Sequence, residues 1–147
     1  MSAWSPEQVR TIYSSISQHA FCFIIEYLGS PVGEGWLQEM NLDRVLLKHP
    51  GKDVRRIDLM IGDKSCWGLG IGTEAIRLLT RFGFETQAVD VIYIPEVADY
   101  NERSLRAFQR IGYRVVAAFD KESGRKALKT YDLALDRHGA DGSASEP

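Results

Sequence analysis

The sequence has few cysteines, no long apolar run and no excess of charge of either sign. Its two cysteines in 147 residues, Cys22 and Cys66, favour free thiols in a reducing cytosol over a disulfide framework. No apolar run approaches the roughly 20 residues of a membrane span, and the first residues lack the pattern of a signal peptide. A net charge of −2 excludes a globally basic nucleic-acid binder. Three scattered histidines offer no metal-ligand spacing. These absences predict a cytoplasmic protein without metal, nucleic acid or membrane partner.

The length and the alternation of elements predict one domain over residues 1–137, followed by a disordered tail over 138–147. Apolar spacing and turn residues predict a helix over residues 5–18, a helix after a glycine-rich turn with apolar positions from Ala75 to Phe82, and a helix between Asn101 and Gly112. Asn101 is expected to cap the last of these helices, and Gly112 to end it. The same analysis predicts strands over residues 20–28, 32–41, 54–62, 89–94, 113–119 and 127–135. This order indicates an α/β protein whose mixed sheet has antiparallel and parallel pairs.

A glycine-rich turn separates the third predicted strand from the next helix, with Gly68, Gly70 and Gly72 alternating. Convergent N–H groups and a helix N-terminus in such a turn favour a phosphate or pyrophosphate. A Walker site needs GKS or GKT, but Glu74 follows Gly72-Thr73. A dinucleotide fold needs GxGxxG immediately after its strand, and the spacing here is GxGxG. A turn that holds no ligand remains the alternative.

Two separated motifs resemble the Gcn5-related N-acetyltransferase (GNAT) superfamily, nearest to bacterial aminoglycoside 6'-N-acetyltransferases. The run from Trp67 to Gly72 is similar to the family's Gln/Arg-x-x-Gly-x-Gly/Ala motif, with Trp in place of the usual Gln or Arg. The second motif resembles the family in Asn101, Ser104 and Gly112-Tyr113, but has Phe108 at the usual Tyr position. The resemblance implies a GNAT-like fold that lacks its first strand and helix here. The strand over residues 20–28 would then be an exposed edge, which makes a homodimer a further prediction.

The resemblance also implies where acetyl-CoA binds, namely in an opening between the strands over 54–62 and 89–94. A backbone N–H near Met60, where the family bulges this strand, would serve the oxyanion. Lys64 would approach the 3'-phosphate, and Ser104 and Arg106 could touch coenzyme A. The implied cofactor-binding residues are Leu59, Met60, Ile61, Trp67, Gly68, Leu69, Gly70, Ile71, Gly72, Thr73, Asn101 and Ser104.

Acetyl transfer to an amine needs a base for the ammonium and a proton for the leaving thiolate. Asp58 is the candidate base and substrate carboxylate, because the Ile57-Asp58 pair resembles aminoglycoside 6'-acetyltransferases. The alternative for Asp58 is a structural ion pair with Arg55 or Arg56. Phe108 cannot donate a proton, so Tyr100, or otherwise Tyr113, is the candidate acid.

Further acids favour a cationic acceptor, and Glu39 and Asp43 are the additional candidate substrate-binding residues. The predicted function is acetyl-CoA-dependent N-acetylation of a primary amine. The preferred candidate acceptor is an aminoglycoside-type aminosugar, as in antibiotic resistance. The alternatives are a protein N-terminus, another small amine, or a non-catalytic acyl-CoA-binding domain.

Overall fold

The computed structural model describes residues 5–7, 20–121 and 128–138. Most of the predicted helix over 5–18, the turn at 122–124 and nearly all of the predicted tail lie outside these ranges. Within the described parts of the chain, no helix has the length and apolar character that crossing a bilayer needs.

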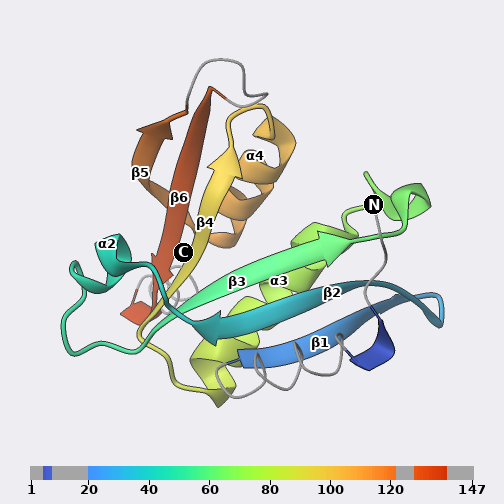
Figure 1. Cartoon of the computed structure of the whole chain (residues 1–147), viewed down its shortest axis with the longest axis horizontal. Coiled ribbons are helices and arrows are strands. Elements are labelled where there is room, and N and C mark those ends of the chain that lie inside the picture. The colour runs from blue at the N-terminus through green and yellow to red at the C-terminus, as the bar shows by residue number, and fades with distance from the viewer. Residues whose placement is uncertain (1–4, 8–19, 122–127, 139–147) are drawn as a thin grey trace, which may run out of the picture.

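Six strands form one mixed sheet in the order β1-β2-β3-β4-β6-β5 (Figure 1). The strands are β1 (Ala20–Tyr27), β2 (Ser30–Glu39), β3 (Val54–Ile61), β4 (Val91–Ala98), β5 (Arg114–Asp120) and β6 (Lys129–Asp136). The helical elements are α2 (Asp43–Leu46), the short turn η1 (Lys64–Cys66), α3 (Ile71–Arg81), the π-helical extension η2 (Phe82–Thr86) and α4 (Glu102–Ile111). The α/β class and the mixed sheet predicted from the sequence are therefore confirmed.

The sheet splits between its two halves at the parallel pair of β3 and β4. The strands pair only at three positions, from Val54↔Val91 to Arg56↔Tyr93, and then diverge (Figure 1). Each strand stays paired on its outer side, β3 with β2 and β4 with β6. The divergence expected from the resemblance is present, and the backbone edge of β3 beyond Arg56 has no strand partner on the β4 side among the described residues.

Two details of these strands correct the predictions. The β4 strand runs to Ala98 instead of residue 94, because its pairing with β6 resumes at Val97↔Tyr131 after an irregularity. The bulge expected near Met60 is absent from the pairing of β2 with β3, which is continuous from Gly33↔Ile61 to Glu39↔Arg55. The irregularity lies in β4 instead, where Glu96 has φ of +59°. This conformation is uncommon for a residue with a side chain.

Two apolar clusters lie on opposite faces of the sheet. The larger one packs α3 and α4 against the sheet, and includes Ile57, Ile76, Leu79, Ile92 and Leu133. The smaller one lies under α2 and includes Met40, Val45, Val54, Val91, Tyr93 and Ala134. The helices α3 and α4 therefore pack on one face of the sheet, and α2 packs on the other.

The strand β1 forms one edge of the sheet. Its exposed side chains include Phe21, Phe23 and Ile24, and an apolar edge strand readily pairs with another chain. The homodimer expected from this edge stays a prediction, and sedimentation velocity at micromolar concentration tests it; a monomer throughout would contradict it.

Gly33 permits the close approach of β2 to β3 beside the split. A Cβ at this position would collide with the backbone carbonyl of Met60 and lie 2.9 Å from the Cα of Ile61. Gly33→Ala should therefore lower the free energy of unfolding by about 1–3 kcal/mol, as overpacking does. Urea denaturation measures the change. Gly62→Ala is the matched control, since nothing lies within 4 Å of its added methyl group; equal stability of the two variants would refute the explanation.

Candidate active site

The first wall of the candidate site is the diverging part of β3. Leu59 faces α3, because a Cβ on Gly72 would lie 3.3 Å from its Cδ2. Met60 is exposed on the opposite face, and Ile61 ends the strand. The β4-facing edge of this segment offers backbone donors and acceptors of the kind that an extended amide chain such as pantetheine can pair with. The positions of Leu59, Met60 and Ile61 thus fit the expected cofactor arm.

The glycine turn stands at the start of α3, on the face that the larger apolar cluster occupies. Gly68 and Gly70 have φ of +81° and +80°, and Gly70 is the N-cap residue of α3 without a side-chain cap. The first N–H groups of a helix have no intrahelical acceptor, and the helix dipole adds partial positive charge. The segment from Gly68 to Thr73, including Leu69 and Ile71, therefore fits a pyrophosphate.

Trp67 does not supply the cation that the usual Arg would bring to this turn. Trp67 is 60% exposed, and its Nε1–H donates to the carbonyl of Ile61 at 2.8 Å. Lys64 lies near it, with Nζ 5.9 Å from the centre of the indole ring. Trp67 therefore joins the turn to the end of β3 and leaves the charge to another residue.

Arg103 brings a guanidinium to the glycine turn from α4. Its Nη1 would lie 3.6 Å from a Cβ on Gly68. Ser104 and Arg106 on this helix were expected from the sequence to touch coenzyme A, whereas Arg103 was not. The available signal was the missing basic residue at position 67, since an anion site that loses one cation needs another. No local pattern says which helix supplies it.

Asn101 occupies the N-cap position of α4, as expected, but its side chain makes no capping hydrogen bond. The prediction that its amide caps the helix is therefore wrong. Its side chain is exposed at the end of the β4–α4 connection. Ser104 is half-buried one turn later.

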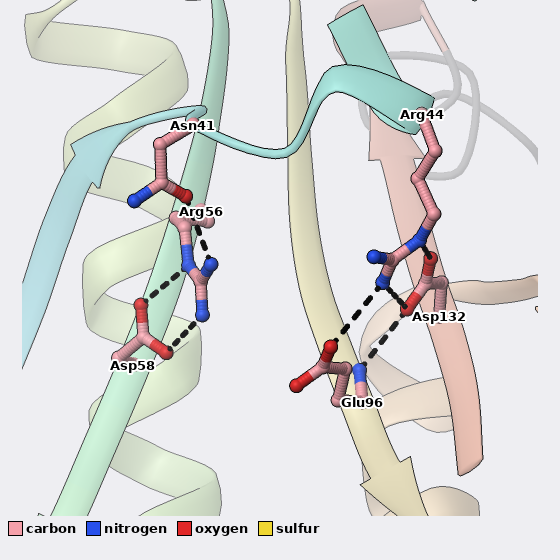
Figure 2. A network of polar contacts seen from close by, with 6 residues as sticks. All are labelled: Asn41, Arg44, Arg56, Asp58, Glu96 and Asp132. Carbon is pink, nitrogen blue, oxygen red and sulfur yellow. Dashed lines mark hydrogen bonds and ion pairs between the residues drawn. The ribbon is translucent and has the colours of Figure 1, made fainter.

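Asp58 lies on β3 just beyond the last paired position, on the face opposite α3. It accepts two hydrogen bonds of 2.8 Å from Nε and Nη2 of Arg56 (Figure 2). It also accepts one of 2.5 Å from Nε2 of Gln38. The remaining Nη1 of Arg56 donates to Oδ1 of Asn41 at 3.0 Å. The ion pair that was the structural alternative is thus present, and it fixes the carboxylate beside the split.

The second wall carries a cluster that the sequence analysis missed, made of Arg44, Glu96 and Asp132. Asp132 is 1% exposed and accepts from Nε and Nη2 of Arg44 at 3.2 Å each, and from the backbone N–H of Glu96 at 3.0 Å (Figure 2). Glu96 Oε1 lies 3.6 Å from Nη2 of Arg44. The available signal was an acid on the buried face of a predicted strand, since such a carboxylate needs a partner.

The other predicted residues are spread around the site. Glu39 is exposed at the end of β2, opposite Arg55 in the register, and Asp43 is exposed at the start of α2. Tyr100 is exposed in the connection from β4 to α4. Tyr113 is buried, and its hydroxyl lies 2.7 Å from Oγ1 of Thr80. Burial raises the pKa of Tyr113 far above its usual range, so this phenol has a packing role and no access to a leaving thiolate.

Comparison with known proteins places this geometry in a family. A family model described as acetyltransferase (GNAT) domain matches residues 2–114. The chain belongs to this family, which uses acetyl-CoA. It is 34% identical over 61 residues to human alpha/beta-tubulin-N-acetyltransferase 9. That alignment covers 42% of this chain, and this chain spans only 29% of the human protein.

Solved structures share the fold. A mutant of spermidine N-acetyltransferase SpeG from Vibrio cholerae aligns with a TM-score of 0.74 and 15% identity, covering 99% of this chain and 86% of that one. Aminoglycoside acetyltransferase AAC(6')-Ib in complex with coenzyme A aligns with a TM-score of 0.68 and 20% identity, covering 96% and 82%. The resemblance seen in the two motifs is therefore confirmed for the fold and the family.

If Arg103 supplies the cation of the glycine turn, Arg103→Gln should weaken the binding of coenzyme A by about tenfold, the cost of one charge-assisted hydrogen bond. Isothermal titration calorimetry with coenzyme A measures this change. Arg110→Gln is the control, because it removes the same charge from the last turn of α4. Equal dissociation constants for the two variants would exclude Arg103 from the site.

Proposed function

We propose that this protein is an acetyl-CoA-dependent N-acetyltransferase of a primary amine. The observation that carries the proposal is the split between β3 and β4, with the glycine turn on one face of the sheet and Asp58 on the other. Such an arrangement brings a thioester and an amine together from opposite faces. It supports the catalytic reading over a non-catalytic acyl-CoA-binding domain, because binding alone needs no carboxylate on the second face.

The chain's own groups suit the proton transfers of this reaction. When bound, acetyl-CoA supplies the acetyl group to the amine nitrogen and leaves as the thiol. Asp58 is the proposed acceptor of the ammonium proton, either directly or through one water. Tyr100 is the proposed proton donor for the leaving group, since Phe108 has no proton to give. The unpaired backbone edge of β3 is the proposed source of the oxyanion donor.

Two classes of acceptor are candidates. The first candidate is an aminosugar of the aminoglycoside type. AAC(6')-Ib, which shares the fold, is named as an aminoglycoside acetyltransferase. A polycation needs strongly acidic walls, however, and two acids near the split are paired with arginines. These pairs are Asp58–Arg56 and Asp132–Arg44. This pairing favours the second candidate, an acceptor with one positive charge, such as a protein N-terminus or another small amine.

Release of free thiol from acetyl-CoA in the presence of an amine panel tests the proposal. The panel holds kanamycin, spermidine, a tetrapeptide with a free N-terminus and a simple alkylamine. We expect turnover with at least one of these amines. Binding of coenzyme A without turnover on any amine would favour the non-catalytic alternative.

Asp58→Asn should lower kcat at least about 100-fold, the usual contribution of a general base, while acetyl-CoA affinity changes little. Steady-state kinetics with the best amine, together with calorimetric binding, separates the two effects. Asp53→Asn is the matched control, because it breaks an ion pair of the same type with Arg55 at the paired end of β3. Unchanged turnover in Asp58→Asn would remove this carboxylate from the mechanism.

A further inference from the structure

Arg44 joins the two halves of the split sheet. It lies on α2, in the connection between β2 and β3, and its side chain reaches β4 and β6 (Figure 2). The buried Val45 and a 2.8 Å hydrogen bond between Nε2 of His49 and the hydroxyl of Tyr93 hold the same connection against the sheet. Arg44 is therefore placed on the face of the sheet that carries Asp58.

The guanidinium of Arg44 is held in place by Asp132, but only two of its three nitrogens donate to it. Asp132 takes Nε and Nη2, and the group lies 4.7 Å from the ring centre of Phe119. Among the described residues, none accepts a hydrogen bond from Nη1, and no dashed line reaches this nitrogen in Figure 2. Because Asp132 is buried, removing its charged partner would be strongly unfavourable. Arg44 therefore stays in place and keeps donors available.

Arg56 provides the contrast on the other wall. Its three guanidinium nitrogens all donate to Asp58 or Asn41, and its side chain is 16% exposed. The side chain of Arg44 is 34% exposed. Of these two arginines, Arg44 is the one with a guanidinium nitrogen, Nη1, that donates to no described residue.

The charges around the split point to the class of acceptor. Among the charged groups drawn in Figure 2, Arg44 and Arg56 stand against Asp58, Glu96 and Asp132, which gives these five groups a net charge of −1. One net negative charge suits a monocationic amine. Free guanidinium donors suit a carbonyl oxygen beside that amine, and they oppose a second positive charge.

We propose that Arg44 is a specificity-determining residue that donates from Nη1 to the carbonyl oxygen next to the reacting amine, so that the preferred acceptor is a peptide N-terminus. This inference rests on the proposed function and deepens it. Asp132 is then the positioning residue that holds Arg44, and the same carboxylate fixes the backbone of Glu96.

The test compares the wild-type protein with the double variant Arg44→Gln/Asp132→Asn, which leaves no buried charge unpaired. Acceptors are a neutral tetrapeptide with a free N-terminus, an alkylamine that has no neighbouring carbonyl, and kanamycin. The control is Arg114→Gln/Asp136→Asn, which removes another arginine–aspartate pair, on β5 and β6. Thermal unfolding establishes that each variant is folded. If the double variant does not fold, Arg44→Lys takes its place, because lysine keeps the charge but lacks the second donor nitrogen.

We expect the wild-type protein to prefer the tetrapeptide to kanamycin. The double variant should raise KM for the tetrapeptide about tenfold, the loss of one charge-assisted hydrogen bond, with kcat and the KM of the alkylamine nearly unchanged. A wild-type preference for kanamycin, or an unchanged KM for the tetrapeptide, would overturn the inference.

A second measurement separates this inference from the proposed function. If no amine supports thiol release, the proposed function fails, and calorimetric binding of the N-acetylated tetrapeptide in the presence of coenzyme A then tests Arg44 alone. Binding to the wild-type protein that is about tenfold weaker in the variant would support its role. Equal binding, or no binding to the wild-type protein, would overturn it.

Discussion

The limited pairing of β3 with β4 is the constraint on which the rest of the structure depends. Each strand is paired on its outer side, β3 with β2 and β4 with β6, whereas the two pair with one another only as far as Arg56↔Tyr93. Backbone groups at such an edge need partners, and an unpaired strand edge readily accepts an extended chain. The unpaired backbone groups at the split need hydrogen-bond partners, and a bound molecule with amide groups can supply them.

The cluster of Arg44, Glu96 and Asp132 on the second wall includes a residue with a strained backbone. Residues with side chains pay about 1–3 kcal/mol to hold a sparsely populated backbone conformation, and Glu96 does so with φ of +59°. The hydrogen bond from its N–H to Asp132 compensates part of this cost, and the Arg44 guanidinium offsets the burial of Asp132. The strained backbone, the buried acid and the position of α2 are therefore one coupled arrangement.

Local sequence patterns were sufficient for the elements and for the glycine turn, because the period of apolar residues and the Gly spacing act over a few residues. The Asp58–Arg56 pair was also accessible, since residues two apart on a strand share a face. Arg44 and Asp132 are 88 positions apart, and only the order of strands brings them together. Arg103 was missed for the same reason, because its contact with Gly68 depends on how α4 is placed against the start of α3.

The near balance of charge in the whole chain conceals an ordered local distribution. Amide groups and Arg103 favour an anion on the α3 face, whereas on the α2 face Asp58 and Asp132 are each paired with an arginine. A carboxylate held by a bidentate guanidinium has lost much of its long-range attraction but keeps a fixed direction for its lone pairs. Such a site selects an acceptor by geometry more than by charge. This favours an amine with a neighbouring hydrogen-bonding group over a flexible polycation.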